Sequence, residues 1–147
     1  LRPGAATAVP IAPFLLVRDD RTVLAAGVAG SSRIPSILLN FLVALVDGKE
    51  DPADAYARPR ILWEDDDSGP RVMVEIAPPL TPEAVPVLKG MGYGNVFSLA
   101  VPSIEGRIFG GIHAVTWAEE SSAWRGFVDG RRPGVAAAPA RIVPPAR

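Results

Sequence analysis

The chain has 147 residues, of which 48% are apolar and 21% are charged, and its formal net charge is −1. This composition is typical of a globular domain with a real core, and the lack of a basic surplus argues against nucleic acid or anionic lipid as a partner. There is no cysteine and only one histidine, His113, so a disulfide scaffold, a zinc–thiolate site and a cysteine nucleophile are excluded. No nucleotide-binding or zinc-finger motif occurs, and we expect no metal and no other cofactor.

The first third of the chain predicts an irregular lead-in over residues 1–12, then a β-hairpin and a buried helix. Apolar residues 14–17 and 22–26 flank a polar turn, which is typical of a hairpin. The stretch 34–46 has apolar residues at helical spacing and elsewhere, so we expect a helix buried on several sides. It is too short to span a bilayer, which needs roughly 20 residues. Gly48 is suited to a left-handed C-cap.

The middle of the chain predicts a short helix and a second strand pair. Asp51 is expected to cap this helix, with Pro52 at its first position. Residues 60–63 and 71–76 are expected to be strands around the acidic turn 64–69. The acidic run allows a cation site, but a solvated turn is favoured, because the glycine and distal glutamate of a calcium loop are missing.

The last part of the chain predicts a third helix over residues 81–89 and three antiparallel strands at 96–101, 107–117 and 124–128. The tail 135–147 is rich in Ala, Pro and Arg, which is typical of disorder. Helices alternating with strand pairs in this way indicate an α+β fold of layered helices and sheets.

The strongest local signal for chemistry is the segment Gly-Val-Ala-Gly-Ser-Ser-Arg-Ile-Pro at 27–35. It joins a predicted strand to the start of the predicted buried helix, where backbone N–H groups and the helix dipole favour a phosphate, a carboxylate or an oxyanion. A plain strand–helix turn is the competing interpretation. Arg33 either faces an anion there or pairs with a carboxylate.

Other polar residues are expected to be structural. Arg60 and Glu75 are predicted to form an ion pair between a helix end and a strand, and His113 is predicted to be packed or hydrogen-bonded. Arg131 and Arg132 are expected in a solvated or carboxylate-paired turn. The tryptophans are expected to pack in the core or at sheet edges rather than form a ligand cage: Trp63, Trp117 and Trp124.

An ordered set of motifs resembles the γ-glutamyltransferase family. That family has a Gly-Ser-Pro-Gly-Gly-Ser-Arg-Ile-like segment after a strand hairpin, and here the hairpin PFLLVRDDRTVLAAG precedes GVAGSSRIP. The helix SILLNFLVALVDG, the segment ADAYARPR, the strand VMVE and the helix end VLKGMGY follow in the family's order. The closing DGRRPG resembles the family's Asp-Pro-Arg-Arg-x-Gly. The resemblance extends from about residue 13 to residue 137.

The resemblance implies that residues 13–134 are the C-terminal part of the small subunit, in a partial αββα sandwich of the N-terminal-nucleophile hydrolase type. It implies catalysis by a threonine that self-cleavage exposes, with its α-amino group as the base, so neither histidine nor cysteine is needed. Gly30 and Ser31 would supply oxyanion-hole N–H groups, and Arg33 would contact the substrate. The implied partner is the larger subunit or the missing N-terminal part of the same precursor, and the implied compartment is periplasmic or extracellular.

Three features depart from the family pattern. The nucleophile is expected before Leu1, and Thr7 is not in position to replace it. Val9 and Pro10 stand where the family has a Ser-Ser pair that holds the substrate carboxylate, and Ser31 replaces the second glycine of the loop. The chain, which starts at Leu1, is therefore expected to be a fragment or processed subunit of a γ-glutamyl amide hydrolase or transferase. A non-catalytic homologue and a β-lactam-acylase-like enzyme are the alternatives.

Overall fold

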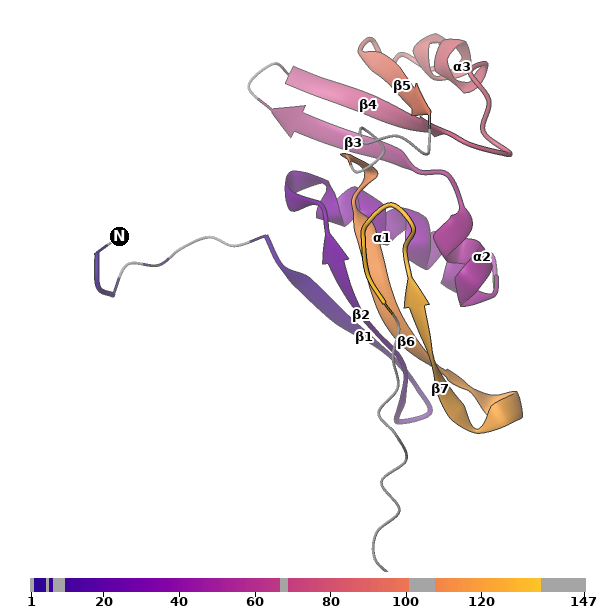
Figure 1. Ribbon diagram of the computed structural model, residues 1–147. Helices are drawn as coiled ribbons and strands as arrows, with labels where there is room; N and C mark the ends of the chain where they lie inside the picture. Colours follow the sequence, from indigo (N-terminus) through magenta and orange to yellow (C-terminus); the bar gives the residue numbers. More distant parts are fainter. Residues whose placement is uncertain (1, 5, 7–9, 67–68, 101–107, 136–147) are drawn as a thin grey trace, which may run out of the picture.

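The structure, a computed structural model, describes residues 2–4, 6, 10–66, 69–100 and 108–135. They form two sheets, a larger one with strand order β1-β2-β6-β7 and a smaller one with order β3-β4-β5. Figure 1 shows α1 and α2 beside the larger sheet and α3 beside the smaller one. The strands are β1 (Ala12–Arg18), β2 (Arg21–Ala29), β3 (Ile61–Asp66), β4 (Gly69–Ile76), β5 (Val96–Ala100), β6 (Gly111–Ala118) and β7 (Ala123–Val128). The helices are α1 (Ile34–Leu42), α2 (Pro52–Ala57) and α3 (Ala84–Gly90), with short helical turns η1 (Ser31–Arg33), η2 (Val43–Asp47) and η4 (Glu119–Ser121).

The first hairpin forms as predicted. Arg18 pairs with Arg21 across the turn, and the two turn residues, Asp19 and Asp20, both have positive φ angles of 50° and 60°. Aspartate tolerates this left-handed conformation, and a two-residue turn of that kind matches the twist of the flanking strands. The hairpin places the end of β2 directly before residues 30–33, which we call the glycine/serine loop.

Strand β5 corrects one prediction, because it runs parallel to β4 and not antiparallel as expected. The chain passes from β4 through α3 before it enters β5, and a connection of this kind returns the strand in the same direction. The other strand pairs are antiparallel, as predicted. The tail prediction for residues 136–147 lies outside the described residues, as do those for Thr7 and Val9.

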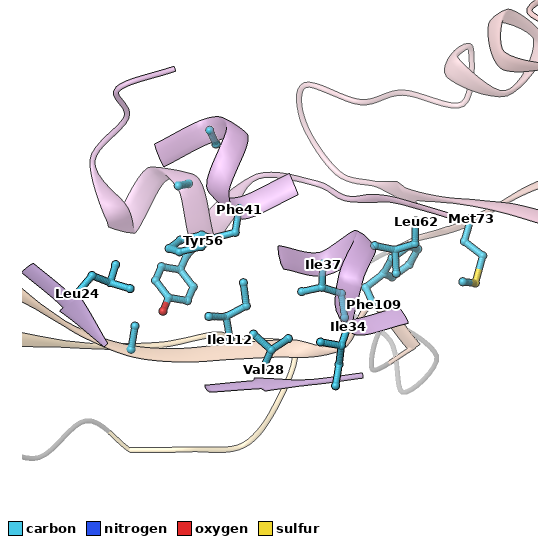
Figure 2. Close-up of a cluster of buried hydrophobic side chains, with 13 residues drawn as sticks. Leu24, Val28, Ile34, Ile37, Phe41, Tyr56, Leu62, Met73, Phe109 and Ile112 are labelled. Carbon is cyan, nitrogen blue, oxygen red and sulfur yellow. The ribbon is translucent and has the colours of Figure 1, made fainter. Parts of the chain in front are cut away.

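The main core lies between α1 and the larger sheet. Ile34, Ile37 and Phe41 of α1 are buried at helical spacing, and they belong to one cluster with Leu24 of β2 and Ile112 of β6. Figure 2 shows these side chains gathered between the helices and the sheet. This packing holds the start of α1 against the end of β2, where the glycine/serine loop lies.

The outward face of the same helical stretch remains exposed. Leu39, Val43 and Val46 are 62%, 46% and 51% exposed. The prediction of a helix buried on several sides is confirmed for the sides that face the larger sheet and β3, while this one stripe stays exposed among the described residues. The C-cap prediction for Gly48 is wrong: Gly48 is right-handed, and Lys49 takes the left-handed conformation with φ 53°. The helical stretch continues from α1 through the π-helical turn η2 and ends at Asp47, and the left-handed residue comes two positions later.

The tryptophans lie mostly at surfaces. Trp117 and Trp124 stack edge to face at 5.7 Å in the β6–β7 hairpin, which agrees with the predicted sheet-edge packing. Trp63 is 54% exposed on β3, so the expectation of packing fails there.

The cap of α2 forms as predicted, because Asp51 Oδ1 accepts a hydrogen bond of 2.8 Å from the N–H of Ala53.

A buried network of two arginines and two carboxylates joins the two sheets. The guanidinium of Arg60 pairs with Asp129 at 2.5 Å. Arg131 donates hydrogen bonds from Nε and Nη2 to the carboxylate of Glu75, at 2.5 and 2.6 Å. Arg131 also pairs with Asp129, while Glu75 accepts the backbone N–H of Arg60 at 2.8 Å. The predicted ion pair between Arg60 and Glu75 is thus wrong, because the guanidinium of Arg60 pairs with Asp129, and Glu75 pairs with Arg131. The predicted carboxylate pairing of Arg131 is confirmed.

The charges of this network balance, which is what burial demands. Burial alone would raise the pKa of Asp129, but the guanidinium groups of Arg60 and Arg131 outweigh that effect and lower it. Asp129 Oδ2 also accepts the N–H of Ile112 at 3.1 Å. The network therefore links the end of β7 to β6, to the residue before β3 and to β4.

Candidate active site

The predicted oxyanion loop forms the turn between β2 and α1. Gly30 follows the last residue of β2, and Ser31 opens the helical turn η1. The first helical hydrogen bond is donated by the N–H of Arg33 to the carbonyl of Gly30, at 3.1 Å. The N–H groups of Gly30 and Ser31 come before that bond, so the helix itself offers them no acceptor. They lie at the positive end of the helix dipole, where an anion is favoured.

Ser31 takes a left-handed backbone conformation, with φ 55°. A residue with a Cβ pays roughly 1–2 kcal/mol for this conformation, whereas glycine adopts it freely. The backbone conformation at this position therefore suits glycine, the residue that the family motif has where this chain has Ser31. Strained residues of this kind concentrate at functional sites, because the surrounding structure must hold them in place.

Close packing beneath the loop leaves little room for a Cβ at two positions. A Cβ on Gly30 would lie 2.4 Å from Cδ1 of Ile37. On Gly110, which has φ +69°, it would lie 2.3 Å from the same atom and 2.4 Å from the carbonyl oxygen of Ala29. Two backbone segments thus meet over Ile37, and the loop rests directly on the residue before β6. Gly110 was missed by the sequence analysis, since nothing local marks it as part of the loop's support.

A buried carboxylate, Glu64, lies next to the loop. Its side chain is only 5% exposed. It accepts hydrogen bonds from Ser32 Oγ at 2.7 Å and from Arg71 Nε and Nη2 at 3.0 and 2.5 Å. The interpretation of residues 64–69 as a solvated turn is therefore wrong at Glu64. The signal that could have found it is the hairpin register, in which Glu64 and Arg71 are directly opposite each other.

The surroundings of Glu64 favour its ionised form. Burial alone would raise the pKa of this carboxyl, but the hydrogen bonds from Ser32 and Arg71 and the nearby charge of Arg33 bring it below its usual value. Glu64 is therefore a fixed negative charge at neutral pH. Among the described residues, no group of three or more His, Asp or Glu side chains is placed to hold a metal ion.

Arg33, the predicted substrate-binding residue, lies between the loop and Glu64. Its Nε is 3.4 Å from Glu64 Oε1, and its side chain is 21% exposed. Its Nη1 reaches the carbonyl oxygen of Gly30 at 3.5 Å. The structure thus brings Gly30, Ser31 and Arg33 together at one place, and it adds Ser32 and Glu64. Contact of Arg33 with a substrate stays a prediction.

His113 lies away from this loop. Its neighbours Ile112 and Ala114 face the core, whereas His113 lines an open, largely apolar hollow of about 1570 Å³ on the opposite face of the larger sheet. Its ring packs against Gly134, where a Cβ would lie 2.6 Å from Cε1 of His113. The hollow also carries Leu15 and Trp124.

Solved structures place this fold among the N-terminal-nucleophile hydrolases. The transpeptidase enzyme CapD of Bacillus anthracis superposes with a TM-score of 0.72 at 28% identity, over 93% of this chain and 75% of that one. A γ-glutamyltranspeptidase of Pseudomonas nitroreducens, in complex with L-DON, gives 0.73 at 23% identity, over 95% and 67%. A cephalosporin acylase of Bacillus halodurans gives 0.63 at 20% identity, over 81% of this chain but only 20% of that one. The α+β fold is therefore a partial sandwich of this hydrolase type, as predicted.

The family model for gamma-glutamyltranspeptidase matches residues 1–139. The chain belongs to the gamma-glutamyltranspeptidase family, which confirms the resemblance seen in the motifs. A search of curated proteins gives no match. No helix among the described residues is long and apolar enough to cross a membrane.

Proposed function

We propose that this chain supplies the oxyanion-stabilising part of an acyltransferase or amide hydrolase that acts on γ-glutamyl amides such as glutathione. The nucleophile in this proposal is an N-terminal threonine outside the 147 residues. The observation that carries the proposal is the Gly30–Ser31 turn, in which two N–H groups precede the first hydrogen bond of the helical turn in a member of this family. Donors held in this way stabilise the charge that develops when an acyl carbonyl is attacked.

The proposed reaction has two halves. The threonine Oγ attacks the amide carbonyl carbon while the α-amino group of the threonine takes its proton. The N–H groups of Gly30 and Ser31 donate to the oxyanion; the C–N bond then breaks, and the amine leaves with that proton. Water or an amino acid resolves the γ-glutamyl ester by the same addition and elimination. Arg33, partly exposed beside the loop, is proposed to attract the substrate carboxylate.

The proposed partner is the larger subunit or the remaining part of the same precursor. The hollow on the outer face of the larger sheet is apolar and open, and Leu15 and Trp124 there are 65% and 47% exposed. The outward face of α1 is similarly exposed. Apolar surfaces of this extent are typical of faces that another protein layer covers.

Substrate class is tested with the complete protein on a panel of γ-glutamyl, glutaryl and simple acyl anilides. The proposal predicts preferential cleavage of the γ-glutamyl anilide, with release of the aniline and transfer to an added amino acid. Preference for glutaryl anilide would favour the alternative of a β-lactam-acylase-like enzyme. The fold is compatible with this alternative, because the cephalosporin acylase shares it. No turnover of any anilide, with an uncleaved precursor by intact mass and N-terminal sequencing, would favour a non-catalytic subunit.

The role of the loop is tested with Gly30→Val in the complete protein. A Cβ at this position lies 2.4 Å from Cδ1 of Ile37, which is fully buried, so either the loop or the core beneath it must shift. We expect kcat to fall by about a hundredfold or more if the loop moves. Gly90→Ala is the matched control, since its Cβ meets nothing within 4 Å, and it should leave kcat unchanged. An unchanged kcat in Gly30→Val, with normal processing, would remove the loop from the mechanism.

A further inference from the structure

A stripe of three polar side chains fastens the α1 stretch to the edge of β3. Ser32, Ser36 and Asn40 are each four residues apart, so they lie on one face of the helical stretch. Asn40 bonds the backbone of Ile61 in both directions: its Nδ2 donates to the carbonyl at 2.9 Å and its Oδ1 accepts the N–H at 3.1 Å. Ser36 does the same at Trp63, at 3.0 and 3.2 Å. These side chains occupy the strand edge that another strand would otherwise use.

The hydrogen-bond partner of the stripe is different at the end nearest the loop. Ser32 bonds a side chain, the carboxylate of Glu64, where Ser36 and Asn40 bond backbone atoms. Glu64 is in turn held by Arg71 from β4 and faces Arg33 from η1. A hydrogen bond to an ionised acceptor is roughly twice as strong as a neutral one. The loop is therefore tied to the smaller sheet by the strongest contact of the stripe.

We propose that Glu64 is a positioning residue for the reaction: through Ser32 and Arg33 it holds the Gly30–Ser31 turn in the conformation that aims both N–H groups at the oxyanion. The inference rests on the proposed function and names the device that sets its geometry. Ser31 has a strained backbone, and strain of this kind persists only where neighbouring contacts enforce it. Ser32, which directly follows Ser31, donates a hydrogen bond to Glu64.

The geometry separates this role from general support of the fold. Ser36 and Ser32 each fasten the same helical stretch to the same strand, but only Ser32 adjoins the Gly30–Ser31 turn. A purely structural seam would respond alike to the loss of either hydroxyl. A positioning role predicts that loss of Ser32 or of the Glu64 charge affects the turn and the reaction, whereas loss of Ser36 affects stability alone.

The test uses Glu64→Gln, Ser32→Ala, Ser32→Thr and the control Ser36→Ala in the complete protein. With the anilide that the wild type cleaves fastest, we expect Glu64→Gln and Ser32→Ala to lower kcat by about tenfold to a hundredfold with little change in KM, because a small misplacement of the donors weakens only the transition state. Ser32→Thr keeps the hydroxyl and should restore most of kcat. Ser36→Ala should leave kcat within about twofold of the wild type.

Amide hydrogen exchange over Gly30–Arg33 provides a readout that does not require turnover. We expect exchange there to be at least about tenfold faster in Glu64→Gln and Ser32→Ala and unchanged in Ser36→Ala. Unchanged exchange, or faster exchange with an unchanged kcat, overturns the positioning role. A wild type that cleaves no anilide overturns the proposed function instead, and the exchange measurement then decides by itself whether Glu64 orders the turn.

Discussion

Two arginine–carboxylate networks in this chain use the same chemistry in different places. The network of Arg60, Glu75, Asp129 and Arg131 is sealed between the two sheets, with Glu75 0% exposed. The Glu64 network lies at the start of α1, where Arg71 and Arg33 remain partly exposed. The first joins elements and is almost fully buried, while the second borders the turn whose N–H groups are proposed to act in the reaction. Burial and neighbourhood therefore distinguish the structural network from the one that is proposed to serve the reaction.

Breaking the sealed network should have the largest effect on stability. Asp129→Ala leaves Arg60 buried without its carboxylate, and breaking a buried pair in this way costs about 3–5 kcal/mol. Urea denaturation of the complete protein measures the loss. The matched control is Glu119→Ala, whose pair with Arg18 is exposed on both sides and should be worth less than about 1 kcal/mol. Similar losses in the two variants would show that the sealed network contributes no more than a surface pair.

Acid should weaken both networks, by a smaller amount than deletion of Asp129. The pKa values of Asp129 and Glu64 are both lowered in the folded protein. Such groups contribute stability above their unfolded pKa values, near 4, and lose it as the pH falls through the folded values. Thermal denaturation between pH 7 and pH 3 should therefore show a steep loss below about pH 4. Glu64→Gln should make this loss shallower, and an identical acid profile would exclude Glu64 as a contributor.

What could be predicted from the sequence was mostly local. The Asp19–Asp20 hairpin and the Asp51 cap depend on a few adjacent residues, and the order of motifs was enough to indicate the family. The partners of Arg60 and Glu75 depend on how two sheets meet, which no local pattern contains. The direction of β5 required knowing that α3 makes a crossover.

The candidate site was predicted in part for the same reason. Gly30, Ser31 and Arg33 are contiguous, so their loop could be recognised as a unit. Glu64 and Gly110 reach the loop only through the fold, and an acidic run such as 64–67 is more often solvated than buried. The positive φ of Ser31 could not be read from serine, which rarely adopts it.

The smallest predicted effect concerns Ser31 itself and sharpens the contrast between strain and stability. Ser31→Gly removes a left-handed serine, which relieves roughly 1–2 kcal/mol of strain, while the more flexible unfolded chain offsets about 0.4–1 kcal/mol of that gain. We expect a net stabilisation of less than about 1 kcal/mol in urea denaturation and an unchanged kcat, because the N–H is retained. Ser122→Gly is the matched control, since Ser122 is also left-handed with φ 48° but lies in the β6–β7 hairpin. An equal gain at both sites with full activity would mean that the Ser31 strain is incidental to the reaction, whereas a kcat loss confined to Ser31→Gly would show that the serine itself helps to hold the turn.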